Sequence, residues 1–263
     1  MEKEWKKLID EVENNRSYSS EPHCNFVDFL REKSTIEDKR AIIQDVERRI
    51  KKVVNCEDNN PGWFFRNFSD TERDLLDDLL TAFELDVQHS ANAYWYANHQ
   101  ELMAYARYSA NPVGRLLLHL YGVHDKVAQR ESDAICTALQ LINFWQDISV
   151  DVPRGRYYLP VALLAKYGIS QAEVQSLQDS PALRQVLAEC CTLARQLMLR
   201  ARALPGRIGG QAGLELRLVM AGGIRILDKI AAQGYNTAQQ RPALSKKDAL
   251  PMLRLALCLP RPR

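Results

Sequence analysis

The sequence lacks the closely spaced cysteine and histidine pairs that mark structural zinc sites. Its 263 residues include only 5 histidines and 6 cysteines, and no two cysteines form a C-x-x-C pair. Zinc sites of the structural kind usually need such pairs, so none is expected. We expect the six cysteines to be free thiols, as in the reducing cytosol.

Long apolar runs are also missing. No stretch approaches the roughly 18 apolar residues that a membrane-spanning helix needs. The residues that follow Met1 are rich in Glu and Lys, which argues against a secretory signal. We therefore expect a cytoplasmic protein that meets a membrane only from the surface, if at all.

The chain has almost no excess of charge of either sign. Its 35 basic and 33 acidic residues give a formal net charge of +2. Nucleic-acid binding needs a strong basic excess or a basic face, so the overall charge gives no reason to expect a nucleic-acid partner.

Apolar residues recur at spacings of three and four, whereas strand signals are scarce. Such periodicity is typical of amphipathic helices. The clearest examples are residues 75–83, 113–120, 135–145 and 183–197. With a hydrophobic share of 46%, the sequence predicts an all-α protein with a sizeable core.

Three segments of the sequence differ in composition and in apolar periodicity. Residues 1–70 are charged and interrupted, with a predicted helix around 36–54, whereas residues 71–250 carry the strongest helical periodicity. Residues 251–263 form an apolar and basic tail. This tail is suited to an anionic membrane surface and equally to packing against the helical core, and the sequence leaves both open.

One predicted helix, over residues 132–151, carries four oxygen-bearing side chains on one face. Gln140, Asn143, Asp147 and Asp151 are spaced three, four and four residues apart, so they fall within an arc of roughly 80°. Two carboxylates one turn apart suit Mg²⁺, which is usually shared with substrate phosphates. The alternative is an exposed aspartate pair on a solvated helix face.

Cations follow this helix directly. Arg154 and Arg156 flank Gly155, and Tyr158 comes two residues later. Guanidinium groups bind phosphate oxygens strongly, so these arginines favour a phosphate-bearing ligand over the solvated-face alternative.

These residues resemble the second aspartate-rich motif of the squalene/phytoene synthase family, and the resemblance covers about residues 70–250. Residues 109–122 and 143–147 are most similar to the bacterial hydroxysqualene synthases within that family. The residues that match the motif and its exit are Leu139, Gln140, Asn143, Asp147, Asp151, Gly155, Arg156, Tyr158, Leu159 and Pro160.

The resemblance implies a single-domain, all-α isoprenoid-synthase bundle with a central apolar cavity. The implied reaction is Mg²⁺-dependent conversion of presqualene diphosphate and water to hydroxysqualene and diphosphate, a lyase reaction. Head-to-head prenyl transfer from farnesyl diphosphate, giving presqualene diphosphate, squalene or phytoene, is the first alternative. A non-catalytic homologue of the same fold is the second. Contact with a membrane surface and the oligomeric state stay open.

The resemblance also implies roles for single residues. Tyr105, Asp147 and Asp151 correspond to catalytic positions, and Tyr105 is equally well explained as a buried aromatic residue. Asp147, Asp151 and Asn143 correspond to metal ligands. The implied substrate-binding residues are Gln140, Asn143, Arg154, Arg156 and Tyr158, together with the small residues Ala110, Val113 and Gly114 along a prenyl chain.

The sequence departs from the family pattern in three places. A first aspartate-rich motif is not identified in residues 1–70. Asp86 is not followed by the arginine that relatives place near it, and Gln146 stands where many relatives have arginine. The acidic residues at 74, 77 and 78 are interpreted as a solvated helix face.

Overall fold

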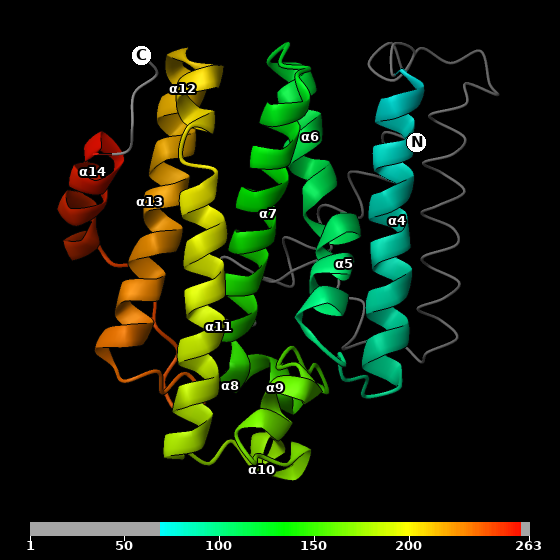
Figure 1. Cartoon of the computed structure of the whole chain (residues 1–263), viewed down its shortest axis with the longest axis vertical. Coiled ribbons are helices and arrows are strands. Elements are labelled where there is room, and N and C mark those ends of the chain that lie inside the picture. Colours follow the sequence, from blue (N-terminus) through cyan, green and yellow to red (C-terminus); the bar gives the residue numbers. More distant parts are fainter. Residues whose placement is uncertain (1–68, 259–263) are drawn as a thin grey trace, which may run out of the picture. The chain divides into compact units, whose positions relative to one another are not determined.

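A computed structural model describes residues 69–258, which form helices joined by short loops (Figure 1). Within these residues the only β-type pairing is an isolated bridge between Trp95 and Tyr157. The prediction of an all-α fold is confirmed. The predicted helix at 36–54 lies outside the described residues.

Within residues 69–258, six helices form the framework. They are α4 (Asp70–Ala91), α5 (His99–Ser109), α6 (Asn111–Leu120), α7 (Lys126–Gln146), α11 (Pro181–Arg200) and α13 (Gly210–Ala232). The other described helices connect or flank them: α8 (Ile148–Asp151), α9 (Val161–Lys166), α10 (Gln171–Gln175), α12 (Leu204–Ile208) and α14 (Ala249–Cys258). Two 3₁₀ turns, η1 (Val152–Arg154) and η2 (Lys246–Asp248), complete the described part.

Side-chain caps fix where the central helices begin. The Asp125 carboxylate accepts hydrogen bonds from the backbone N–H groups of Val127 and Ala128 at the start of α7. Ser180 caps α11 in the same way, and Pro181 occupies its first position. Capping satisfies N–H groups that have no partner inside the helix, and typically stabilises by about 1 kcal/mol.

Helix α7 is the centre of the packing. It contacts α6 on one side and α11 on the other, and also touches α13 (Figure 1). Its residues Ala138, Leu141 and Trp145 are fully buried, as expected for the apolar stripe predicted at 135–145. The end of α7 is therefore held by the core on several sides, which gives the residues there a fixed position.

The apolar side chains of α6 are not all buried, although an apolar stripe on a helix usually faces the core. Val113, Leu117 and Leu120 are exposed within the described part of the chain, whereas Gly114 and Leu118 face the core. A Cβ atom at Gly114 would lie 2.4 Å from Ser132 Oγ. The missing side chain lets α6 approach α7 closely, so the glycine decides which face of α6 is buried.

Helix α14 packs on α13 and continues the turn η2. Asp248 in η2 is buried and accepts hydrogen bonds from Arg225 Nε and Lys229 Nζ of α13, both at 2.7 Å. The segment predicted as an apolar-basic tail thus begins as a helix attached to the core. Among the described helices, none is long and apolar enough to cross a membrane.

Candidate active site at the end of helix α7

The predicted aspartate helix is divided at Asp147. This residue ends α7 with φ −101° and ψ 17°, and α8 follows directly, so the expectation of one uninterrupted helix over 132–151 is corrected. Helical hydrogen bonding nevertheless bridges the break. The N–H of Asp147 donates to Asn143 O at 3.0 Å, and the N–H of Asp151 donates to Asp147 O at 2.8 Å. The two carboxylates keep their sequence spacing across a bend.

Asp147 is paired with an arginine from a distant part of the chain. Arg241 donates from Nε to Asp147 Oδ1 at 2.6 Å and from Nη2 to Oδ2 at 3.4 Å. Both side chains are mostly buried. This two-point contact holds the carboxylate in one orientation and balances its charge.

Gln146 anchors the segment that carries this arginine. Its buried side-chain Nε2 donates to the carbonyl oxygen of Pro242 at 2.7 Å. Gln146 is the position at which many relatives have arginine, and here a neutral amide holds the residue next to Arg241. The local cation therefore comes from residue 241, whereas position 146 supplies a hydrogen bond.

Asp151 shares a second arginine with Asp86 of α4. Arg156 reaches Asp151 Oδ1 through Nη1 at 3.4 Å and Asp86 Oδ2 through Nη2 at 3.5 Å. All three side chains are almost fully buried. Asp86, which no arginine follows closely in the sequence, is thus paired with Arg156, 70 residues further along the chain.

Tyr105 lies in a cluster of aromatic rings close to these acids. Its ring centroid is 6.0 Å from that of Tyr96 and 6.3 Å from that of Phe144. Tyr158 stacks on Phe144 with centroids 3.6 Å apart. Burial, with smaller contributions from nearby acids including Asp86, raises the pKa of the Tyr158 phenol well above its usual value. Tyr158 therefore stays neutral and can donate a hydrogen bond.

His89 belongs to the same cluster. Its Nδ1 is 3.0 Å from the hydroxyl oxygen of Tyr96, and its ring stacks on Tyr94 at 4.3 Å. Burial lowers the pKa of His89, although nearby Glu101 partly opposes the shift. Sequence reasoning missed His89, Tyr96 and Phe144 as neighbours of Tyr105, and the dense aromatic run at 94–96 was the available signal.

The remaining predicted residues occupy different surroundings. Gln140 is half-buried, and Asn143 and Arg154 are exposed within the described part. Ala110 caps α6 and Val113 is exposed, whereas Gly114 is buried against Ser132 and Cys136 of α7. Gly114 therefore faces a neighbouring helix, whereas two other glycines, both on α13, line a pocket.

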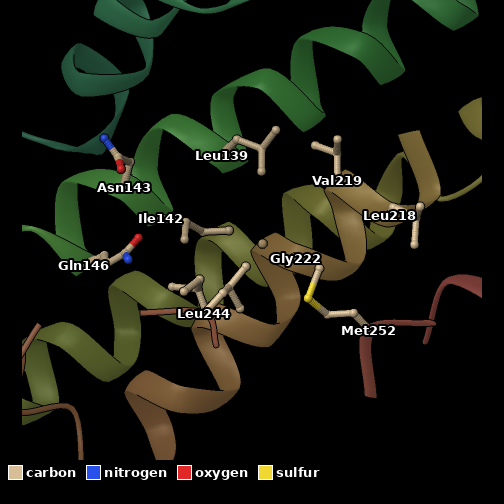
Figure 2. A pocket seen from close by; sticks show the side chains of 11 residues that line it. Leu139, Ile142, Asn143, Gln146, Leu218, Val219, Gly222, Leu244 and Met252 are labelled. Atoms are coloured by element: carbon tan, nitrogen blue, oxygen red, sulfur yellow. The ribbon is translucent and has the colours of Figure 1, made fainter. Parts of the chain in front are cut away.

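Those glycines lie on α13, in a pocket of about 490 Å³ (Figure 2). Gly222 and Gly223 form part of its wall, and Asn143 and Gln146 of α7 supply its polar groups. The other lining residues are Leu139, Ile142, Leu218, Val219, Ile226, Leu244 and Met252. An apolar pocket with two amides at one end suits a hydrocarbon ligand with a polar head.

The acids at the end of α7 fit Mg²⁺ in donor type. Carboxylates at Asp147 and Asp151 and the amide oxygen of Asn143 are the hard oxygen ligands that this ion prefers. Each carboxylate already has an arginine partner, so an incoming ion competes with Arg241 and Arg156. No group of three or more acidic, histidine or cysteine ligands occurs among residues 69–258. Within the described residues, these donors alone do not complete the ligand set of a divalent ion.

The helical fold that carries this pocket and the two aspartates is that of squalene-synthase-like isoprenoid synthases. A family model described as squalene/phytoene synthase matches residues 23–248, and the chain belongs to this family.

Individual relatives agree with this assignment. A hydroxysqualene synthase of Rhodopseudomonas palustris is 34% identical over 152 residues, which cover 57% of this chain and 50% of the relative. A phytoene synthase of Thermus thermophilus is 30% identical over 145 residues, 55% of this chain and 49% of the relative. The chain thus spans about half the length of the curated relatives it matches.

Solved structures show the same fold. The squalene synthase HpnC from Alicyclobacillus acidocaldarius has a TM-score of 0.70 and 31% identity, with 80% of each chain covered. A dehydrosqualene synthase in complex with ligand has a TM-score of 0.66 and covers 88% of this chain and 81% of its own. At 18% identity this second likeness concerns the fold alone.

Proposed function

We propose that the chain converts presqualene diphosphate and water to hydroxysqualene and diphosphate. The observation that carries the proposal is the position of Asp147, which directly follows Gln146 of the apolar pocket and is paired with Arg241. A ligand with a hydrocarbon body in the pocket thus has a charged site next to it for its diphosphate. Similarity to hydroxysqualene synthases supports this particular reaction.

In this proposal Asp147, Asp151 and Asn143 would hold Mg²⁺, and the ion when bound would supply positive charge that stabilises a diphosphate leaving group. Arg241 and Arg156 are the cations nearest to these carboxylates and can turn toward diphosphate oxygens. The carbon–oxygen bond to the diphosphate breaks, and the leaving group keeps the electron pair. The carbocation rearranges as its cyclopropane ring opens. Water then forms the new carbon–oxygen bond at the rearranged cation and gives its proton to the released diphosphate or to solvent, so no redox partner is needed.

The chain's apolar residues would control access of water to this reaction. Leu139, Ile142 and Leu244 line the pocket that we assign to the hydrocarbon body. A carbocation in such surroundings reacts with the water that the site admits, and Asn143 and Gln146 are the polar groups of the pocket that can orient a water molecule.

Head-to-head prenyl transfer is the second candidate. Phytoene synthases from bacteria and plants are among the similar proteins, at 27–30% identity. The same pocket and acids would then serve farnesyl diphosphate or a longer prenyl diphosphate. The third candidate, a non-catalytic homologue, is favoured by the arginine pairing of both motif carboxylates.

One set of incubations separates the three candidates. Purified full-length chain is mixed with Mg²⁺ and either presqualene diphosphate or farnesyl diphosphate, and the products are identified by mass spectrometry. Hydroxysqualene from the first substrate supports the proposed reaction, and presqualene diphosphate from the second supports transfer. Failure to bind or convert either substrate would leave the non-catalytic candidate.

A matched pair of variants ties the activity to the site. Asp147→Asn is expected to lower the rate by on the order of 100-fold, the usual cost of losing a key charge-stabilising group. Asp228→Asn removes a carboxylate that pairs with Arg195 on the surface of α11 and α13, and should leave the rate unchanged.

A further inference from the structure

The outer side of α14 presents a row of leucines. Leu250, Leu253 and Leu257 are 57%, 46% and 56% exposed, and their spacings of three and four residues place them on one face of the helix. Helix α14 packs on α13 (Figure 1), and its residue Ala256 is buried. We refer to Leu250, Leu253 and Leu257 as the α14 face.

Within residues 243–258, the exposed charges are all positive. Lys246, Lys247 and Arg254 are exposed, whereas Asp248, the only acidic residue between 243 and 258, is 2% exposed. Its carboxylate is turned inward, onto Arg225 and Lys229. The segment therefore exposes leucines and three cations to solvent, but no anion.

This combination matches an anionic lipid surface better than an aqueous one. Leucines that enter the headgroup region are removed from water, and cations nearby are attracted to anionic lipids by about 1 kcal/mol each. Helix α14 has ten residues and is too short to span a bilayer, which leaves an orientation parallel to the membrane plane.

We propose that the α14 face, with Lys246, Lys247 and Arg254, docks the protein on the surface of an anionic bilayer. The same segment supplies Leu244 and Met252 to the wall of the apolar pocket (Figure 2). Docking would thus bring that wall next to lipid, from which a hydrocarbon-bodied ligand could enter. This consequence for ligand entry rests on the proposed function, whereas the docking itself does not.

Vesicle co-sedimentation of the full-length chain tests the docking. We expect binding to phosphatidylcholine vesicles with about one third phosphatidylglycerol, weaker binding to phosphatidylcholine alone, and loss of binding as salt is raised. Lys246→Glu with Lys247→Glu should weaken binding at least 25-fold, at about fivefold per cation removed. Leu253→Ser with Leu257→Ser should weaken it by about tenfold or more.

Each variant has a control at another exposed position. Lys126→Glu with Arg130→Glu changes the charge equally on α7, and Leu120→Ser removes an exposed leucine from α6. Neither control should alter vesicle binding by more than about twofold. If the leucine double variant unfolds, the lysine double variant still tests the docking proposal. No binding by the unmodified chain, or equal losses in controls and test variants, would overturn the proposal.

Cys258 at the end of α14 gives a readout without any substitution. It is exposed, whereas Cys190 and Cys191 are buried. Its reaction with a water-soluble maleimide, followed by peptide mass mapping, should be fast in buffer and several-fold slower with anionic vesicles. Slow labelling already in buffer would mean that another part of the chain or a second copy covers the α14 face, and the proposal would be wrong. A dimer in solution that the leucine variant dissociates would have the same meaning.

Discussion

Arg241 and Asp147 are 94 residues apart in the chain and form a two-point ion pair, with Nε 2.6 Å from Oδ1 and Nη2 3.4 Å from Oδ2. The carboxylate that the family motif assigns to a metal is thus already balanced by a cation of the protein itself. A divalent ion that binds Asp147 competes with this arginine for the carboxylate oxygens. Arg241 is therefore expected to set how tightly the site binds metal before substrate arrives.

Removal of the Arg241 cation should strengthen metal binding. For Arg241→Gln we expect about fivefold tighter binding of Mn²⁺ alone, because a charge-assisted contact of about 1 kcal/mol no longer competes. Electron paramagnetic resonance of free Mn²⁺ measures this directly. Arg195→Gln, which removes a similar pair with Asp228, should leave Mn²⁺ binding as it is. Weaker Mn²⁺ binding in Arg241→Gln would show that the arginine does not compete.

The buried amide of Gln146 should contribute to stability through Pro242. Gln146→Leu leaves the Pro242 carbonyl without its 2.7 Å donor, and we expect a loss of about 1–2 kcal/mol in the free energy of unfolding. Urea denaturation provides the measurement. Gln211→Leu is the control, because that amide contacts only Glu215 on the exposed side of α13. If Gln146→Leu lowers the free energy of unfolding no more than the control does, the hydrogen bond to Pro242 does not stabilise the fold.

Gln146 and Arg241 should also be coupled. If Gln146 positions the segment that carries Arg241, Arg241→Gln should have a smaller effect on Mn²⁺ binding in a Gln146→Leu background than in the unmodified chain. A double-mutant cycle isolates this interaction. Additive effects of the two substitutions would show that the Gln146–Pro242 hydrogen bond and the Arg241–Asp147 ion pair act independently.

Asp248 should make the attachment of α14 sensitive to acid. Hydrogen bonds from Lys229 first, and then from Arg225 and Ser245, hold the pKa of Asp248 below its ordinary value of 3.8. A lowered folded-state pKa means that its stabilisation is complete above about pH 4 and is lost as the pH falls toward the lowered pKa.

Asp248→Asn provides the test of this dependence. The variant should be less stable than the unmodified chain at pH 7, and the difference should shrink as the pH falls below 4. Urea denaturation across this range gives both curves. A difference that stays constant with pH would mean that the charge of Asp248 does not contribute.

The two pocket glycines should respond differently to alanine. At Gly223 a Cβ atom would lie 3.0 Å from Leu139 Cδ2 and 3.1 Å from Met198 Cε, whereas at Gly222 the nearest atom is Met252 Cε at 3.4 Å. Alanine favours helix over glycine by up to about 1 kcal/mol, and crowding costs about 1–3 kcal/mol. We expect Gly222→Ala to be neutral or stabilising and Gly223→Ala to be less stable than Gly222→Ala by about 1 kcal/mol, measured by thermal unfolding. Equal stabilities would show that Leu139 and Met198 move aside freely.

The helices and the paired aspartates could be predicted from the sequence because both depend on local spacing. Ile135, Ile142 and Trp145 repeat at helical intervals and are buried in the structure. Asp147 and Asp151 keep their one-turn relationship even though the helix axis breaks between them.

The partners of those aspartates could not be predicted, because no local pattern encodes them. Arg241 reaches Asp147 only after α13 returns the chain to α7, and Arg156 joins Asp151 to Asp86 across 70 residues. The exposure of one side of α6 could not be predicted either, because an apolar stripe does not show which neighbouring element covers it. Residues 1–68 lie outside the part of the chain that the structure describes.

The absence of side chains at Gly222 and Gly223 has a consequence for how this pocket can evolve. A glycine codon becomes an alanine codon by a single base change, so the space along α13 can be reduced in small inherited steps. Such steps leave the codons for Asp147, Asp151 and their arginines untouched. If the pocket holds the hydrocarbon body as proposed, the bulk of the ligand that it accepts can therefore diverge between lineages while the charged residues stay the same.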